Sequence, residues 1–576
     1  MTAAPRSSLR FGVMCTGTVF DAWQARCLDA LLAVDGVEPG LLIVDARPRL
    51  SHRAGDRVTR LVRSENLLWK GFNDGFVARR SQALRKVDLG ETFASVPRID
   101  CTVTKRGKWS ELFDAADVEI IRRHELDFLL RFAFGIVRGD VLTAARYGIW
   151  SFHHDDEAVV RGGPPCFWEI YDRDPVSGVM LQRLTERLDS GVVLHKGFVR
   201  TAATSYARNS DAVHFAGAAF PAKICRDILA GHDSHVTAAP TESKAPIRHN
   251  PTNRQMLRFL ARQARSFVTG QVQSSVRRDH WNVGVVDAPI ARFVDPSFAP
   301  AIRWLPRATS REVYVADPFG TRGREPNDNG TGTGESILVE AFDQRTQLGD
   351  IRALDVQTGR LGERAVLPDA VHMSYPYLVR HDGDLFCMPE AARGRGVRLF
   401  RARRFPDDWE DLGVLVPDVA AVDPTVFEHD GRWWLFFTDR DVDSNAALHV
   451  WHAPALRGPW SPHAANPVKT DVRSARPAGT PFVHEGRLYR PAQDCSETYG
   501  GAIAINDVEE LTTDRFRERV AHRVRPEPSS RYPAGRHTLS AMGNQTLIDG
   551  KRRTFRGRTV ASAIEAKLRR GLARAR

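Results

Sequence analysis

Short apolar runs alternate with helical stretches through the first 235 residues. The runs Leu9–Cys15, Leu41–Val44 and Asp127–Phe134 are each short enough for a strand, and a glycine-bearing turn and an apolar-faced helix follow the first of them. This alternation is typical of β-α-β units, in which a parallel sheet lies between helices. We therefore expect an α/β domain with a mostly parallel sheet over residues 1–235. Ligands of such sheets bind at the carboxyl ends of the strands.

A second pattern begins after a polar stretch that contains Pro240, Pro246 and Pro251. Because prolines interrupt regular structure, residues 236–280 are expected to form a linker and a helix. Further on, apolar strands flank four turns that end in glycine, at intervals of 48, 55 and 64 residues: Gly383, Gly431, Gly486 and Gly550. Asp-Gly turns between apolar runs predict hairpins, and repeats of this length predict four-stranded blades. With an earlier strand at Ser336–Glu340, we expect an all-β five-bladed propeller over residues 281–558.

Composition favours a protein with more than one core. A chain of 576 residues is too long for a single core, and 42% of it is apolar. No run approaches the roughly 20 apolar residues of a membrane span, and residues 1–6 lack the apolar stretch of a secretory signal. We therefore expect a cytoplasmic location. The seven cysteines are scattered without a Cys-x-x-Cys pair, which predicts reduced, buried thiols rather than disulfides or a zinc site.

Most of the net charge of +12 lies in the last 26 residues, where ten lysines and arginines face only Glu565. Apolar residues recur there at every fourth position: Val560, Ile564, Leu568 and Leu572. Residues 559–576 are thus expected to form a basic amphipathic helix that can contact an anionic membrane surface, or else a solvated, frayed tail. The rest of the chain is close to neutral, which argues against a nucleic-acid partner.

A histidine and a carboxylate lie on either side of a glycine/proline loop between residues 151 and 189. His153 follows the strand-like Tyr147–Trp150, and Asp189 opens a later turn. Transfer of an acyl group to an amine needs a group that takes up the amine's proton and a donor for the oxyanion. His153 can fill either role, and Asp189 within hydrogen-bond reach would orient it. The alternative is a histidine bonded to the backbone and an aspartate that only starts a turn.

This segment resembles the signature of the formyltransferase fold, shared by methionyl-tRNA formyltransferase, sugar N-formyltransferases and formyltetrahydrofolate hydrolase. Those proteins carry Asn-x-His, Arg-Gly, Gly-x-Thr and Leu-Asp-x-Gly in this order. The counterparts here are Ser151-Phe152-His153, Arg161-Gly162, Gly178-Val179-Met180 and Leu188-Asp189-Ser190-Gly191. The resemblance implies a Rossmann-like domain with His153 and Asp189 at the catalytic positions. It also implies a site for the donor 10-formyltetrahydrofolate, formed by Phe134, Gly135, Ile136 and Val137 together with Arg161 and Gly162.

Two departures from this signature bear on activity. Ser151 replaces the asparagine that donates to the oxyanion, and loss of one such donor costs about 2.7–4 kcal/mol in other enzymes. We expect His154 to supply the missing donor. Asp155, Asp156 and Glu157 follow, and these carboxylates could attract a protonated amine. A metal held by them with the two histidines is an alternative, but no metal is expected.

The repeat region resembles five-bladed propellers of the furanosidase type, and more closely the N-terminal domain of plant glucosamine inositolphosphorylceramide transferases. The segments that carry the resemblance are Asp317-Pro318-Phe319, Ser374-Tyr375-Pro376-Tyr377, Pro389-Glu390, Asp423-Pro424-Thr425-Val426-Phe427 and Asp494. In such propellers carboxylates converge on a central channel, so Asp317, Glu390 and Asp423 could form an acid/base set. A channel that binds sugar without cleaving it is the favoured interpretation.

Together these patterns predict an N-formyltransferase. It would move a formyl group from 10-formyltetrahydrofolate to the amine of an amino sugar, nucleotide-linked or in a glycan, while the propeller binds the glycan. One alternative is a non-catalytic glycan-binding protein with a degenerate formyltransferase fold. Another is a propeller protein that is itself active on glycans. Transfer to a tRNA is disfavoured, since a propeller stands in place of the small barrel of the tRNA enzyme.

Overall fold

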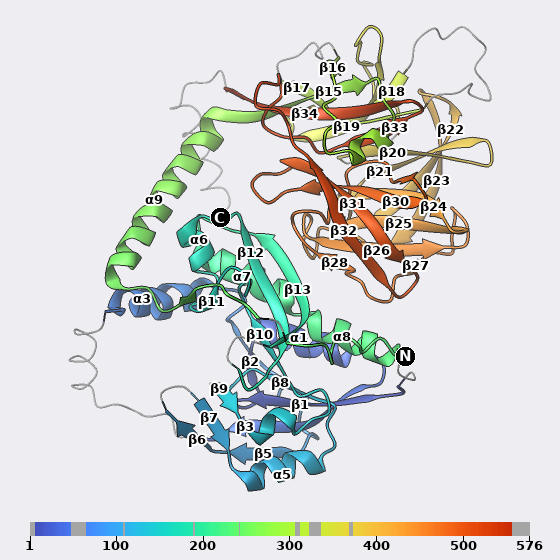
Figure 1. The fold of residues 1–576 in the computed structure, drawn as a ribbon. Helices are drawn as coiled ribbons and strands as arrows, with labels where there is room; N and C mark the ends of the chain where they lie inside the picture. Colours follow the sequence, from blue (N-terminus) through green and yellow to red (C-terminus); the bar gives the residue numbers. More distant parts are fainter. Residues whose placement is uncertain are drawn as a thin grey trace. The chain divides into compact units, whose positions relative to one another are not determined.

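The chain folds as two compact units, Met1–Val268 and Thr269–Arg576 (Figure 1). The structure, a computed structural model, describes residues 6–47, 65–107, 110–187, 191–240, 242–305, 312–321, 336–367 and 372–555. The division falls inside helix α9 (Asn253–Val276), within the stretch expected to be a linker and a helix. The start of α9 belongs to the first unit, because Met256 and Phe259 are buried in its core.

A seven-stranded sheet forms the centre of the first unit. Its strands lie in the order β13-β12-β10-β8-β1-β3-β5; the five from β10 to β5 run parallel, while β12 and β13 are antiparallel. The strands are β1 Leu9–Cys15, β3 Val37–Asp45, β5 Arg98–Cys101, β8 Phe128–Arg131, β10 Ile149–His153, β12 Val176–Arg183 and β13 Val192–Arg200. The prediction of a mostly parallel sheet is confirmed.

Helices cover both faces of this sheet because side chains alternate along its strands. Phe11 and Val13 of β1 pack in one cluster with residues of α1, α8 and α9, whereas Met14 packs in another with residues of α5. The helices are α1 Ala22–Leu32, α3 Leu67–Phe72, α4 Ala78–Arg80, α5 Ala115–Arg123, α6 Trp168–Asp172, α7 Tyr206–Gly217 and α8 Phe220–Leu229.

Two strand pairs and a three-stranded sheet complete the described part of the first unit. They are β2 (Val19–Asp21) with β4 (Lys86–Asp88), β6 (Val103–Arg106) with β7 (Ser110–Phe113) and β9 (Ile136–Arg138), and β11 (Arg161–Gly162) with β14 (Ile247–Arg248). The last pair brings part of the expected linker back to the glycine/proline loop, so residues 247 and 248 belong to the folded domain rather than to a connection.

The described strands of the second unit form five antiparallel sheets. The first joins both ends of the unit, since β15 (Arg277–Val286) pairs with β34 (Gln545–Phe555), flanked by β16 (Arg303–Trp304) and β33 (Leu539–Met542). The second contains β17 Val313–Gly320, β18 Ser336–Asp343 and β19 Leu348–Asp355. The third contains β20 Ser374–His381, β21 Asp384–Glu390, β22 Gly396–Arg404 and β23 Asp408–Pro417.

The fourth and fifth sheets follow in chain order. The fourth contains β24 Ala421–His429, β25 Arg432–Asp439, β26 Ala447–Ala453, β27 Ser461–Pro462 and β28 Lys469–Thr470. The fifth contains β29 Phe482–His484, β30 Arg487–Asp494, β31 Ala502–Leu511 and β32 Phe516–Val524. None of these sheets closes on itself, and their arrangement as the blades of a propeller stays a prediction.

Three of the four predicted glycine turns connect hairpins, and the fourth prediction is wrong. The turns at Gly383, Gly431 and Gly486 join β20 to β21, β24 to β25 and β29 to β30. Gly550 instead lies inside β34, next to the buried Asp549, whose carboxylate accepts hydrogen bonds from two backbone amides. Burial of that carboxylate in the strand explains why the dipeptide does not form a turn.

Other expectations concern cysteines and membranes. All seven cysteines are buried and unpaired. Among the described residues, no helix is both long and apolar enough to cross a membrane. The helix or tail expected over residues 559–576 lies outside the described part of the chain.

Candidate functional site

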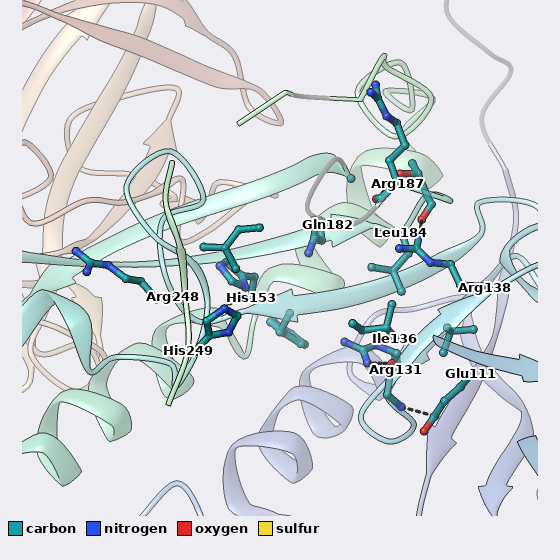
Figure 2. A pocket seen from close by; sticks show the side chains of 18 of the residues that line it. Glu111, Arg131, Ile136, Arg138, His153, Gln182, Leu184, Arg187, Arg248 and His249 are labelled. Carbon is teal, nitrogen blue, oxygen red and sulfur yellow. Dashed lines mark hydrogen bonds between the residues drawn. The ribbon is translucent and has the colours of Figure 1, made fainter. Parts of the chain in front are cut away.

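A cavity of about 1120 Å³ lies in the first unit, at the carboxyl ends of β8 and β10 (Figure 2). Arg131 ends β8, His153 ends β10, and both line the cavity. The other walls come from residues 135–138, from Gly162 and Gly163, and from residues 247–250. The cavity therefore lies where ligands of parallel sheets bind.

His153 faces this cavity from the end of its strand. Its Nε2 atom is 3.4 Å from the carbonyl oxygen of Val160, in the loop that leads to Gly162. Asp189, its expected partner, lies outside the described residues, although Arg187 and Gly191 on either side line the cavity. The catalytic roles of His153 and Asp189 stay predictions.

Ser151 does not line the cavity. The residue is 1% exposed, and its Oγ accepts hydrogen bonds from Nε and Nη2 of Arg131, at 3.1 and 2.8 Å. Its own hydroxyl is 3.4 Å from the carbonyl oxygen of Phe152. Arg131 also donates through Nη1 to the carbonyl oxygens of Phe134 and Gly135, at 3.1 and 2.7 Å. The guanidinium thus ties the end of β10 to the loop after β8.

The expectation that His154 replaces the missing donor needs correction. Its ring is buried in the core, 3.8 Å from the ring of His214 and edge-on to Trp23. Burial, and then the neighbouring imidazoles, hold the pKa of His154 well below its usual range. His154 is directed away from the cavity because successive residues of an extended chain point to opposite sides.

The carboxylates after His154 do not reach the cavity either, which corrects the expectation that they attract the amine. Asp155 is fully buried and accepts a hydrogen bond from the backbone nitrogen of Cys166 at 2.9 Å. Asp156 and Glu157 both pair with Lys196, at 2.9 and 2.6 Å. Their charges are therefore used within the fold.

The cavity is instead rich in cationic groups. Among its described lining residues, Glu111 is the one carboxylate, and it is paired with Arg47 at 2.6 Å and accepts a hydrogen bond from the backbone of Gly135 at 2.6 Å. The basic side chains in the wall are Lys105, Arg131, Arg138, Arg187 and Arg248, with His153 and His249. This charge suits an anionic ligand.

Four of the six residues expected to bind the donor line the cavity: Gly135, Ile136, Val137 and Gly162. Phe134 and Arg161 do not, so the expectation is corrected for these two residues. The ring of Phe134 packs 4.9 Å from that of Phe113, and Arg161 donates to the carbonyl oxygen of Ala245 at 2.7 Å. Both side chains hold the cavity walls in place.

Two glycines are required by close backbone contacts at this site. Gly162 has φ +91°, and a Cβ there would lie 2.2 Å from the carbonyl oxygen of Arg248. A Cβ on Gly178 would lie 2.7–2.9 Å from Asp156 in the loop after His153. Such distances exclude any other side chain without movement of the backbone.

A second cavity, of about 260 Å³, lies in the second unit. Asp317 of β17, Glu340 of β18 and Glu390 of β21 line it, together with Arg440 and Arg476. Asp423 lies behind the wall, because Arg476 binds its carboxylate at 2.6 Å and Gln493 binds it at 2.7 Å. The backbone nitrogen of Asp423 is 3.3 Å from Glu390. Asp317, Glu390 and Asp423, which were expected to lie together, are thus close to one another. Their chemical roles stay predictions.

The same backbone feature occurs in three sheets around this cavity. Asp317, Tyr375 and Asp423 each precede a proline, have φ values of 49°, 47° and 51°, and lie at a bulge of the first strand of their sheet. Bulges re-aim side chains, and positive φ at non-glycine residues concentrates at functional sites. The middle position carries a tyrosine rather than a carboxylate.

A buried trio adjoins this cavity. Ligand atoms of Asp317, His537 and Asp549 lie within 4.8 Å of one another, a spacing that could hold a metal ion. His537 Nδ1 lies 2.5 Å from Asp549, and its ring stacks 3.9 Å from that of Trp281. Burial raises the pKa of Asp317 to about 6, against the lowering effect of His537.

Comparisons with known proteins separate the two halves of the chain. Residues 342–537 match the family described as "Glucosamine inositolphosphorylceramide transferase 1, N-terminal". The protein of that name from Oryza sativa subsp. japonica is 39% identical over 190 residues, which are 32% of this chain and 25% of the relative. Methionyl-tRNA formyltransferase of Phenylobacterium zucineum is 36% identical over 124 residues, 20% of this chain and 39% of the relative.

The chain thus spans a quarter to two fifths of the length of these relatives. Among solved structures, glycinamide ribonucleotide transformylase 1 from Symbiobacterium toebii is similar with a TM-score of 0.26 and 17% identity, over 39% of this chain and 89% of that one. The chain contains a formyltransferase-like domain and a domain similar to the N-terminal part of glucosamine inositolphosphorylceramide transferase 1. These relatives are named as transferases.

Several residues at the two cavities escaped the sequence reasoning. Gln182 and Arg131 carry no motif, and they reach the first cavity through cross-strand pairing with the segment around Ser151. Glu340 reaches the second cavity from β18, and Arg476 reaches it from the connection between β28 and β29. The only available signal was Glu340 within the strand-like run Ser336–Glu340, where a charge ends an apolar strand.

Proposed function

We propose that this protein is an N-formyltransferase. It moves a formyl group from 10-formyltetrahydrofolate to the amine of an amino sugar, nucleotide-linked or in a glycan, and the second unit binds the glycan. The observation that carries the proposal is His153 at the end of β10, facing a large cavity beside Gly135–Val137 and Gly162 in a formyltransferase-like domain.

The reaction needs one proton acceptor and one donor. The amine nitrogen forms a bond to the formyl carbon, the bond from that carbon to the donor nitrogen breaks, and the proton lost by the amine ends on that nitrogen. His153 would take up this proton and pass it on. Asp189, two residues before the cavity-lining Gly191, would orient the imidazole.

We infer that Gln182 supplies the donor for the oxyanion. In the antiparallel pair of β10 and β12, Gln182 lies directly opposite Ser151, so its side chain is on the same face of the sheet. Figure 2 shows Gln182 and His153 directed toward the same cavity. An amide from the neighbouring strand would then do what the missing asparagine does, while Ser151 remains bound to Arg131.

The residues present fit a folate donor. Lys105, Arg138 and Arg187 line the cavity and would bind the carboxylates of its glutamate tail. The volume of about 1120 Å³ slightly exceeds the range of about 300–1000 Å³ that is common for ligand cavities. Such a volume has room for a donor and an acceptor together.

For the second unit we propose a propeller. The pairing of β15 with β34 joins the first and last described strands of the unit, and such a pairing would close the ring of a propeller. Its similarity to a glucosamine inositolphosphorylceramide transferase, a protein named for an amino sugar, supports an amino sugar as acceptor.

The test is formyl transfer by the full chain. Incubation with 10-formyltetrahydrofolate and a panel of amino sugars and their nucleotides should release tetrahydrofolate and give a formylated amine, detected by mass spectrometry. His153→Ala should lower the rate about 10²–10⁴-fold, whereas His124→Ala, after helix α5, should not change it. Absence of transfer to every amine, together with absence of folate binding by calorimetry, would sink the proposal.

Substitutions of Gln182 and Ser151 distinguish an active formyltransferase site from a degenerate one. Gln182→Leu should slow transfer about 10²-fold or more while leaving folate affinity unchanged. Ser151→Asn should bring no gain, because the serine hydroxyl already serves Arg131. A large gain from Ser151→Asn would favour the non-catalytic, glycan-binding alternative for the natural chain.

A further inference from the structure

We propose that the cavity of the second unit binds the protonated amine of a single amino-sugar residue, with the ammonium group at Glu340. This inference makes the proposed function more specific, and it rests on that function for the biological role of the sugar. The charge argument itself concerns the described residues of the second unit alone.

Carboxylates outnumber bases around this cavity. Asp317, Glu340 and Glu390 line it, while Asp423 and Asp549 lie buried beside them. The bases near these carboxylates are Arg440, Arg476 and His537, which form ion pairs with them, and the buried Arg536, which interacts with Asp549 without an ion pair. Five carboxylates therefore share four bases in a buried region. A cation from outside, or bound protons, must supply the rest of the positive charge.

Each base is already engaged by a carboxylate other than Glu340. Arg476 binds Asp423 at 2.6 Å. Arg440 is 3.4 Å from Glu390. His537 is 2.5 Å from Asp549 and 3.5 Å from Asp317. The missing charge is therefore concentrated at Glu340.

Glu340 has no adequate partner within the described chain. The residue is 7% exposed and lines the cavity, and His372 Nε2, at 3.9 Å, is beyond hydrogen-bond distance. The Nδ1 atom of His372 accepts a hydrogen bond from the backbone nitrogen of Gly349 at 2.8 Å, so a neutral ring carries its proton on Nε2. Burial lowers the pKa of His372 to about 4, which keeps it neutral near pH 7. Glu340 thus faces a neutral neighbour and an open cavity.

A buried carboxylate without a partner is costly, and burial together with the nearby carboxylates raises the pKa of Glu340 well above its usual value. An ammonium group at this position would form a charge-assisted hydrogen bond and restore the missing positive charge. A neutral hydroxyl at the same carbon would leave the charge unbalanced. The cavity should therefore distinguish an amino sugar from the corresponding hydroxyl sugar.

The remaining walls suit a sugar ring. Trp281, Tyr314, Phe342 and Tyr499 line the cavity with aromatic surface, and Arg440, Arg476 and Ser374 offer polar groups for ring hydroxyls. A volume of about 260 Å³ is below the range of about 300–1000 Å³ of larger ligands, so one ring rather than a chain fills it. N-acylation removes the positive charge, so an N-formylated sugar should bind less tightly than the amine.

The experiment is a titration of the full chain with methyl glucosaminide, methyl glucoside and methyl N-formylglucosaminide, followed by saturation-transfer NMR and calorimetry at pH 6.5. The amine should bind about tenfold or more tightly than either neutral sugar, a difference of about 1.4 kcal/mol. Glu340→Gln should remove this preference while leaving the affinity for methyl glucoside unchanged. Glu428→Gln, at an exposed position of β24, is the matched control and should behave as the natural chain.

Three results would overturn the proposal: equal binding of the amine and the glucoside, an unchanged preference in Glu340→Gln, or no binding of the amine. If Glu340→Gln proves poorly folded by circular dichroism, Asp317→Asn, on the same wall, should also weaken amine binding selectively. His153→Ala separates this proposal from formyl transfer, because it should lower the transfer rate about 10²–10⁴-fold and leave amine binding intact. Absence of transfer by the natural chain, together with selective amine binding, would refute the enzyme and keep the sugar site.

Discussion

Replacing Glu169 by glutamine should remove a pH-dependent loss of stability from the first unit. Glu169 lies in α6, is 4% exposed, and its carboxyl group shares a hydrogen bond with that of Asp155. Asp155, in the loop after His153, is fully buried beside it. Burial raises the pKa of Glu169 to about 7, and burial together with the charge of Glu169 raises that of Asp155. These two carboxyl groups hold the loop that leads to Gly162.

The sign of this pH dependence follows from the protonation of Glu169 in the folded and the unfolded chain. Between pH 4.5 and about 7, Glu169 is ionised in the unfolded chain but protonated in the folded one. Its contribution to stability is fully present below pH 4.5 and is lost as the pH rises through the folded pKa. The difference between 4.5 and about 7 corresponds to about 3 kcal/mol, at about 1.4 kcal/mol per pKa unit.

The glutamine variant cannot ionise, so its stability should vary less with pH. The difference in unfolding free energy between variant and natural chain should change by about 3 kcal/mol between pH 4.5 and pH 8, in favour of the variant at the higher pH. This change does not depend on the constant cost of burying the amide. Asp155 remains, so part of the pH dependence should persist.

Amide hydrogen exchange of the full chain is the assay, read in peptides from β10 and α7 and corrected for intrinsic exchange at each pH. Glu119→Gln, at an exposed position of α5, should follow the natural chain throughout. Parallel profiles for Glu169→Gln and the natural chain would refute the reasoning, because they would mean that Glu169 is already ionised in the folded state.

Two further substitutions test the packing of each unit. Gly178→Ala should destabilise the first unit by about 1–3 kcal/mol, since its Cβ would lie within 2.9 Å of Asp156, whereas Gly394→Ala, with no atom within 4 Å of its Cβ, should have little effect in thermal unfolding. Arg476→Met should cost about 3–5 kcal/mol in urea unfolding because it leaves Asp423 buried without its partner. The double variant with Asp423→Asn should recover most of that loss; no recovery would mean that Arg476 acts through packing alone.

The sequence patterns identified strands and hairpins reliably where apolar residues formed a continuous run. The run Leu9–Cys15 became β1 with the same bounds, and three of four glycine turns connect hairpins. The pattern misplaced Gly550, because a dipeptide cannot reveal that Asp549 accepts hydrogen bonds from the backbone amides of His537 and Thr538, just before β33. It also took residues 236–280 for a connection, since the pairing of β14 with β11 joins segments more than 80 residues apart.

At the candidate sites, too, the sequence identified some functional residues and missed others. His153, Gly162 and Gly178 could be found from the short motifs that resemble the formyltransferase signature, since each motif spans only a few residues. The part played by Ser151, the burial of His154 and the neutralisation of Asp156 by Lys196 depend on side chains from other elements. Residue types alone cannot show where such partners lie.

By itself, the sequence determined that this protein has an α/β half with a formyltransferase-like signature and a β-rich half with a repeated hairpin. The α/β and β-rich halves follow from periodicity and local turn chemistry, which act over a few residues, and the formyltransferase-like signature follows from the resemblance of short motifs. Only the tertiary structure decided which polar groups face the cavities. Sheet register set Gln182 opposite Ser151, and the packing of separate sheets left Glu340 without a base of its own. The physical reason is that burial and charge pairing depend on neighbours in space, and the sequence lists neighbours only along the chain.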